Sequence, residues 1–124
     1  MTAAATSRIA AARAPGTSRP VQATDATFAQ EVLESDRPVL VEFTAAWCGP
    51  CRQLGPVLTR MAQEEAGRLK VVTIDVDHNP AITVAYGVLS TPTLMLFRDG
   101  EPVRSMVGAR SQRRLLEELS DVLT

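Results

Sequence analysis

The chain has 124 residues, which is the length of one ordinary domain. Apolar residues make up 45% of the chain and charged residues 22%, a composition that excludes a disordered tail and a collagen-like fibre. No apolar stretch approaches the roughly 18 residues that cross a bilayer, which argues against an integral membrane protein. The net charge of −1 lacks the basic excess that is typical of nucleic-acid-binding proteins.

Residues 1–20 differ from the rest of the chain because they are rich in Ala, Ser, Thr and Arg and contain no acidic residue. Such a segment buries too little apolar surface to offset the entropy lost on ordering. We therefore expect a flexible extension at 1–20 and one folded domain at 21–124. The longest apolar run of the extension, around Ile9, is too short for a secretory signal. We expect a cytoplasmic protein, and the alternative is an organellar protein with 1–20 as its transit peptide.

Helical and extended apolar patterns alternate after the extension. Thr24 or Asp25 can cap a first helix that runs to about Ser35. The β-branched run at 39–43 then predicts a strand. A longer helix follows, with a core-facing stripe at helical spacing that consists of Leu54, Val57, Leu58 and Met61. We expect Gly67 to end this helix and Pro56 to kink it.

The second half of the domain continues the alternation. The pattern predicts a strand over 69–76, a short helix from Asn79-Pro80 to near Gly87, and strands over 93–97 and 103–107. Asp99-Gly100 between the last two strands indicates a hairpin turn. Ser111 caps a final amphipathic helix. Two β–helix–β crossovers, a hairpin and a closing helix predict an α/β fold with a mixed central sheet that is flanked by helices on both faces.

Cys48 and Cys51 lie three residues apart, directly after a predicted strand and at the start of a predicted helix. Side chains at i and i+3 share one helix face with Cβ atoms about 5–6 Å apart, whereas a disulfide needs about 3.5–4.5 Å. A small adjustment of the first turn therefore lets a disulfide form and break. The unpaired N–H groups and the dipole of that turn favour a thiolate on Cys48. We expect Cys51, one turn deeper, to be less exposed and to act as the resolving thiol.

Three other interpretations of this cysteine pair compete with redox chemistry. A structural disulfide that closes so short a loop would add only about 2 kcal/mol to the free energy of unfolding. A structural zinc site needs four ligands, and Cys48, Cys51 and His78 are the only soft candidates, so we expect no metal. Two incidental buried thiols are the third alternative. We favour a reversible dithiol–disulfide pair.

Several other residues carry predictions of their own. Glu42 interrupts an apolar strand, where burial would raise its pKa and make it a general base for Cys51; the alternative is a solvated or salt-bridged carboxylate. Trp47 either packs in the core or forms an aromatic rim beside the cysteines. We expect His78 in a surface turn, and X–Pro statistics alone favour a trans bond before Pro92. A solvated face with local ion pairs is predicted for Arg110, Arg113, Arg114, Glu117 and Glu118.

Several motifs occur in a fixed order along the chain. They are Val41-Glu42-Phe43, Trp47-Cys48-Gly49-Pro50-Cys51, Pro56, Asp75-Val76-Asp77-His78-Asn79-Pro80, Thr91-Pro92-Thr93, Asp99-Gly100 and Val107-Gly108-Ala109. In these motifs the chain resembles the thioredoxin family over about 21–124. The resemblance implies the thioredoxin fold and a cis bond before Pro92. It also implies a substrate groove formed by Trp47, Gly49, Pro50, Thr91, Pro92 and Gly108.

The resemblance further implies a function. Cys48 would attack a substrate disulfide, Cys51 would release the reduced substrate, and a thioredoxin reductase using NADPH would recycle the pair. The chain itself would then be a monomer without a cofactor that acts on disulfide-containing proteins. A redox-gated binding protein without turnover and an oxidase or isomerase are the alternatives. The chain departs from the family at Glu42, which replaces an aspartate, at Thr44, which replaces a frequent tryptophan, and at Thr73, which replaces a frequent lysine. Without that lysine, we expect the pKa of Glu42 to be more elevated than in typical members.

Overall fold

A computed structural model of the chain describes residues 18–123, so residues 1–17 of the predicted extension lie outside the described residues. The described residues form one five-stranded sheet in the order β1-β3-β2-β4-β5. Parallel pairing joins β1, β3 and β2, while β4 runs antiparallel to β2 and β5 antiparallel to β4. The strands are β1 (Val21–Gln22), β2 (Val39–Thr44), β3 (Lys70–Asp75), β4 (Thr93–Arg98) and β5 (Glu101–Val107). The predicted mixed sheet is thus confirmed.

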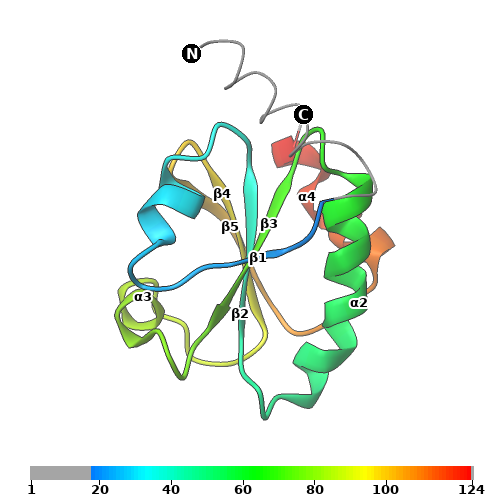
Figure 1. Cartoon of the computed structure of the whole chain (residues 1–124). Helices are drawn as coiled ribbons and strands as arrows, with labels where there is room; N and C mark the ends of the chain where they lie inside the picture. The colour runs from blue at the N-terminus through cyan, green and yellow to red at the C-terminus, as the bar shows by residue number, and fades with distance from the viewer. Residues whose placement is uncertain (1–17, 124) are drawn as a thin grey trace.

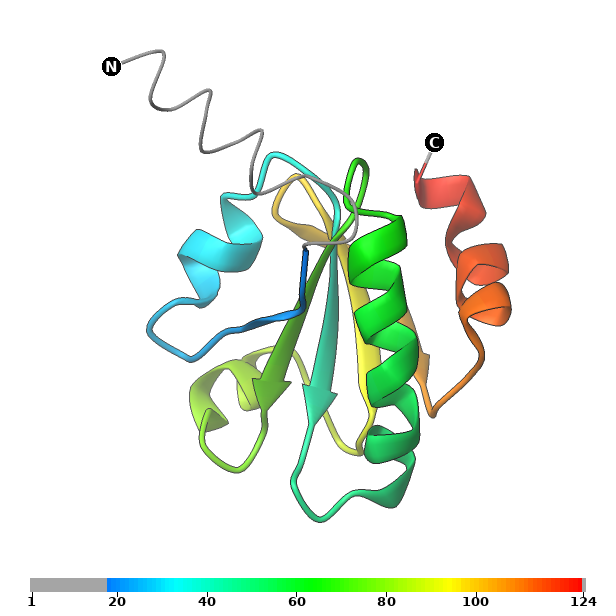
Figure 2. The ribbon, with the colours of Figure 1, turned by 45° about the vertical axis from the view of Figure 1, so that its right-hand side comes forward.

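Helices cover both faces of this sheet, as predicted (Figure 1). They are η1 (Ala29–Leu33), α2 (Gly49–Glu64), α3 (Pro80–Ala85) and α4 (Gln112–Leu123). The turned view shows α2 and α4 on one side of the strands and η1 and α3 on the other (Figure 2). Within residues 18–123, every helix is too short or too polar to cross a lipid bilayer.

Each face of the sheet carries its own hydrophobic core because successive side chains of a strand point to opposite faces. Leu40 of β2 packs with Leu54 and Leu58 of α2 and with Leu115 and Leu119 of α4. On the other face, Val39, Val41 and Phe43 pack with residues of η1 and α3, where the rings of Phe28, Tyr86 and Phe97 lie 5.2–5.6 Å apart. Strand β2 is therefore buried from both sides from Val39 to Phe43, so the side chain of Glu42 loses contact with water.

Two local signals in the sequence are confirmed in atomic detail. Asp99 and Gly100 both adopt positive φ, 52° and 80°, in the hairpin turn between β4 and β5. Ser111 caps α4, since its hydroxyl oxygen accepts a hydrogen bond from the Arg114 N–H at 3.1 Å.

The predicted first helix is present but shorter than expected, because it covers only 29–33 and neither begins after Thr24 or Asp25 nor reaches Ser35. The segment contains a single π-helical stretch, η1, in which the Glu34 N–H donates to the Ala29 carbonyl at 2.9 Å. The residues before it form a turn, because the backbone N–H groups of Thr24 and Thr27 each bond the other residue's hydroxyl, at 2.8 and 3.2 Å. These reciprocal bonds have the arrangement of a capping box, so Thr24 caps the turn that leads into η1.

The predicted end of the second helix also needs correction. Helix α2 ends at Glu64, before Gly67, and Glu65 closes it through a bond from its N–H to the Met61 carbonyl at 2.9 Å. Turns then follow, and Arg37 donates from Nη1 to the carbonyl of Ala66 at 2.6 Å. Pro56 lies inside α2, which continues on both sides of it, and the kink remains a prediction.

Candidate active site

The junction between β2 and α2 places the two cysteines at a helix N-terminus. Cys48 is the N-cap residue of α2, with an extended backbone, and Pro50 occupies the first turn, where its missing N–H costs nothing. Cys48 and Cys51 form a disulfide, with their Cα atoms 5.3 Å apart. The predicted pairing of cysteines at the start of the helix is therefore present.

The Sγ atom of Cys48 occupies the position that a capping oxygen usually takes. It accepts a hydrogen bond from the Cys51 N–H at 3.2 Å. In the reduced protein the same N–H and the positive end of the helix dipole stabilise a thiolate on Cys48 relative to the thiol. The arrangement can therefore supply a sulfur nucleophile near neutral pH.

Burial does not distinguish the two cysteines in the way the sequence predicts. Cys48 is 3% exposed and Cys51 is 5% exposed, so Cys51 is not the less exposed of the two. Both sulfurs pack with Ala45, and Val76 covers the same cluster. The chemical difference between them therefore comes from the capping hydrogen bond, which is made to Cys48.

Glu42 is buried, and the alternative of a solvated carboxylate is wrong. Its exposed fraction is 4%, and its Oε2 atom has no hydrogen-bond partner. Loss of hydration raises the pKa of Glu42 from its ordinary value of 4.5 to about 7. The side chain is thus able to take up and release a proton near neutral pH, as the sequence predicts.

The sheet register directs Glu42 toward the face that α2 covers. Glu42 is two residues from Leu40, and it is paired with Leu94 on one side and Thr73 on the other. Leu40 and Leu94 both belong to the core beneath α2. Thr73 is half-buried and brings no charge, so the carboxylate has no cation across the strand pair. Burial is accordingly the cause of the raised pKa.

Trp47 lies on the surface, so the alternative of core packing is wrong, and the aromatic rim stays a prediction. Its side chain is 68% exposed, and its indole N–H donates to Asp77 Oδ2 at 2.8 Å. A shallow depression of about 100 Å³ brings it together with Thr91 and is lined by Trp47, Val76, Thr83, Val88, Leu89, Ser90 and Thr91. Val76 lines this depression and also packs against the two cysteines, so the depression and the disulfide share one apolar residue.

Next to Thr91, a backbone hydrogen bond joins two loops that are distant in sequence, one at Pro92 and one at Gly108. The Thr91–Pro92 bond is cis, as the family resemblance implies and X–Pro statistics do not. Gly108 follows β5 with φ of 100°, a backbone conformation that favours glycine, and its N–H donates to the Pro92 carbonyl at 2.9 Å. The structure therefore brings together Pro92 and Gly108, both predicted as groove residues.

Two residues near the site escaped the sequence analysis as separate candidates. Asp77 fixes the Trp47 ring through the bond described above, and its place in the motif at 75–80 is the signal that pointed to it. Leu89 is 97% exposed and lines the depression, a position that no apolar periodicity indicates. His78 has an exposed side chain, with Nδ1 3.3 Å from Asp75 Oδ2, so the predicted surface turn is confirmed.

Comparisons with known proteins agree with this geometry. The family model described as thioredoxin matches residues 19–121. The thioredoxin of Mycobacterium tuberculosis (strain H37Rv) is 52% identical over 103 residues, which are 83% of this chain and 89% of the relative. Thioredoxin 1 of a Nostoc species is 50% identical over 98 residues, 79% of this chain and 92% of the relative. A bifunctional thioredoxin reductase/thioredoxin of Mycobacterium leprae is 47% identical over 83% of this chain and 22% of its own length. The chain belongs to the thioredoxin family and is a thiol–disulfide oxidoreductase of the protein-disulfide reductase class.

Proposed function

We propose that Cys48 and Cys51 transfer two electrons to a disulfide of a protein substrate. The Cys48 thiolate attacks one substrate sulfur, the substrate S–S bond breaks, and the second substrate sulfur leaves as a thiolate that takes up a proton. The Cys51 thiolate then attacks Cys48 Sγ in the mixed disulfide. The first substrate sulfur leaves, and the Cys48–Cys51 disulfide remains.

The hydrogen bond from the Cys51 N–H to Cys48 Sγ carries this assignment of roles. It is made to one sulfur only, at the residue that caps α2. A thiolate at that position is stabilised by a donor that is already in place, so no reorganisation is needed when the disulfide opens. Cys48 is therefore the attacking sulfur and Cys51 the resolving one.

Glu42 is the general base in this proposal. Resolution of the mixed disulfide requires Cys51 to lose its proton, and a base works best when its pKa lies near the operating pH. Burial raises the pKa of Glu42 to about 7, and the register directs its side chain to the face beneath α2, the helix that carries Cys51. Glu42 thus accepts the Cys51 proton, directly or through one water.

The substrate segment binds in the region between Trp47 and Gly108. Thr91 offers its backbone N–H and C=O groups to an extended chain in the manner of an added strand, and Trp47 supplies apolar contact. Gly49 and Pro50, the two residues that follow Cys48, are small and leave room at the start of α2 for a substrate disulfide to approach Cys48. The groove residues are then Trp47, Gly49, Pro50, Thr91, Pro92 and Gly108.

A thioredoxin reductase is the partner that returns the disulfide to the dithiol. The support is the M. leprae relative, in which a reductase and a thioredoxin occur in one chain. The electrons come from NADPH through that reductase, so this chain needs no cofactor of its own. We further propose that the protein is a cytoplasmic monomer, with residues 1–20 as an extension to the domain at 21–124.

The expected result for Cys48→Ser is loss of catalysed insulin reduction. With dithiothreitol as the electron source, the unaltered chain accelerates precipitation of the insulin B chain, and the Cys48→Ser variant gives the rate of dithiothreitol alone. Turbidity over time is the measurement. Arg113→Ala, a change on an exposed part of α4, is the matched control and retains full activity. Equal rates for Cys48→Ser and the unaltered chain would refute the proposal.

A further inference from the structure

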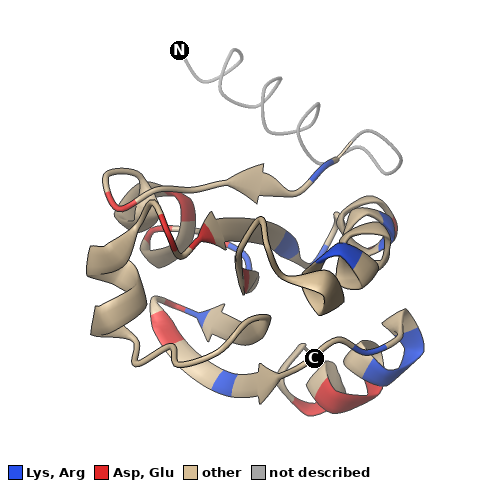
Figure 3. Cartoon of the chain, turned by 90° about the horizontal axis from the view of Figure 1, so that it is seen from below, with Lys and Arg blue, Asp and Glu red and all other residues tan. Residues whose placement is uncertain are grey.

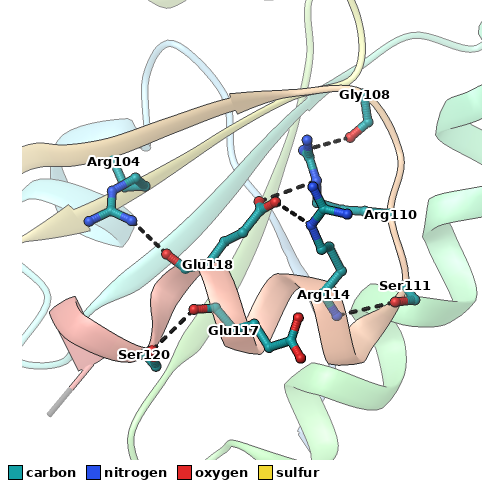
Figure 4. Close-up of polar contacts among 8 residues, drawn as sticks. All are labelled: Arg104, Gly108, Arg110, Ser111, Arg114, Glu117, Glu118 and Ser120. Atoms are coloured by element: carbon teal, nitrogen blue, oxygen red, sulfur yellow. Dashed lines mark hydrogen bonds and ion pairs between the residues drawn. The ribbon is translucent and has the colours of Figure 1, made fainter.

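The loop that leaves β5 is held by charged side chains from its own end and from α4. The Arg110 Nη1 atom donates to the Gly108 carbonyl at 3.1 Å, and Arg110 Nε lies 3.2 Å from Glu118 Oε1. Arg114 Nε donates to the other carboxylate oxygen of Glu118 at 2.8 Å. In the close-up view, the Glu118 carboxylate faces the guanidinium groups of both arginines, and Arg110 also reaches Gly108 (Figure 4).

Glu118 is held in place through both its backbone and its side chain, and its carboxylate is not fully solvated. Its backbone carbonyl accepts a hydrogen bond from Arg104 of β5 at 2.6 Å, which ties α4 to the sheet at this residue. The side chain is 24% exposed, and its Oε1 atom is buried without a hydrogen-bond partner, so Arg110 faces it as an ion pair. Helix α4 carries residues of both signs (Figure 3), but this shielding sets the Arg110–Glu118 pair apart from an ordinary surface pair.

The backbone at Gly108 is held in position by hydrogen bonds and not by side-chain packing. A Cβ atom at Gly108 would meet no heavy atom within 4 Å, so the peptide borders open space. Its N–H is bonded to the Pro92 carbonyl at 2.9 Å, and its C=O is bonded to Arg110. Loss of the Arg110 bond would leave the Gly108–Ala109 peptide group, which contains this carbonyl, free to rotate.

We propose that Arg110, held by Glu118, is a positioning residue that fixes the Gly108 peptide in the orientation that receives an extended protein substrate. The proposal rests on the groove assigned under Proposed function. An ordered groove binds more tightly because less conformational entropy is lost on binding. The pair therefore lowers the KM for protein disulfides, while a small disulfide that meets only Cys48 does not depend on it.

The test is the replacement of Arg110 by methionine, which keeps an unbranched apolar stem and removes both the hydrogen bond to Gly108 and the ion pair with Glu118. We expect the KM for insulin to rise about fivefold with kcat within about twofold, as befits the loss of one charge-assisted hydrogen bond in a groove. The rate with 5,5′-dithiobis(2-nitrobenzoate) stays unchanged. Arg114→Met is the matched control, because Arg114 contacts the same carboxylate but not Gly108; its KM stays at that of the unaltered chain.

Hydrogen exchange at the Gly108 amide gives a readout that needs no substrate. We expect exchange to be about tenfold faster in Arg110→Met and unchanged in Arg114→Met, because rotation of the loosened Gly108–Ala109 peptide group moves Gly108 and breaks the bond from its N–H to Pro92 more often. If Arg110→Met does not fold, Glu118→Gln, which keeps the shape but removes the charge, is expected to raise the KM for insulin about twofold.

Three results would overturn the proposal. One is an unchanged KM for insulin in a folded Arg110→Met, or in Glu118→Gln where that variant is used. Another is an equal loss of activity on insulin and on the small disulfide, and the last is an equal effect of Arg114→Met. These are distinguishable from failure of the proposed function, in which the unaltered chain itself would not reduce insulin.

Discussion

Cys51→Ser is expected to convert turnover into a stable covalent complex with the substrate. Cys48 still attacks the substrate disulfide, because its sulfur keeps the backbone donor at position 51, but no thiol remains to resolve the mixed disulfide. Multiple-turnover reduction of insulin falls to the rate of dithiothreitol alone. A disulfide-linked adduct of one chain with one insulin molecule accumulates in the absence of dithiothreitol, as measured by nonreducing electrophoresis and mass spectrometry.

The double variant Cys48→Ser/Cys51→Ser is the control for this adduct. In this variant serine replaces both cysteines at the start of α2. Because neither position has a sulfur atom, we expect no adduct. Adduct formation by Cys48→Ser at the rate of Cys51→Ser would contradict the assignment of Cys48 as the attacking residue. The same adduct, formed in the source cell and analysed by mass spectrometry, would identify the protein substrates.

Glu42→Gln is expected to stabilise the oxidised protein at neutral and alkaline pH. The pKa of Glu42 is about 7 in the folded protein and near 4.5 in the unfolded chain. Below pH 4.5 both states hold the proton, and the substitution has little effect. Between about pH 4.5 and 7 the unfolded chain has released a proton that the folded protein retains, so the free energy of unfolding of the unaltered chain falls as the pH rises through this window and levels off above it. Above that range the glutamine variant gains about 3 kcal/mol.

Urea unfolding at a series of pH values measures this gain. Glu117→Gln is the matched control, since Glu117 is exposed, and its effect should stay small at every pH. A constant difference between Glu42→Gln and the unaltered chain from pH 4 to 9 would contradict a raised pKa at Glu42. Glu42→Gln also tests whether Glu42 is the general base. In this variant the rate of dithiol oxidation should no longer depend on a group that titrates near pH 7.

The elements predicted best are those that depend on neighbours in sequence. The hairpin at Asp99-Gly100 and the cap at Ser111 are decided within four residues, and the structure has both. The sulfur pair is also local, because the start of a helix brings Cys48 and Cys51 together. Burial of Glu42 could be predicted because strand β2 is apolar on both sides of it.

Tertiary contacts decided what the sequence pattern could not. Apolar residues at i and i+4 share a face in both an α-helix and a π-helix, so Phe28 and Val32 did not reveal that η1 is a π-helix. The equal burial of the two cysteines depends on Ala45 and Val76, which reach them from the preceding loop and from the end of β3. The link from Glu118 to Gly108 passes through Arg110, and only the fold places these residues together.

Asp25 connects two segments that are far apart in sequence. Its carboxylate accepts hydrogen bonds from the N–H groups of Ala81 and Ile82 at 3.2 and 2.9 Å, and its own N–H donates to Asn79 Oδ1 at 2.8 Å. The neighbouring strand β1 is only two residues long and pairs with β3 alone. The amino-terminal edge of the sheet and α3 are therefore expected to open and close as a single cooperative unit. A change at residue 25 would then loosen the polypeptide more than fifty positions downstream.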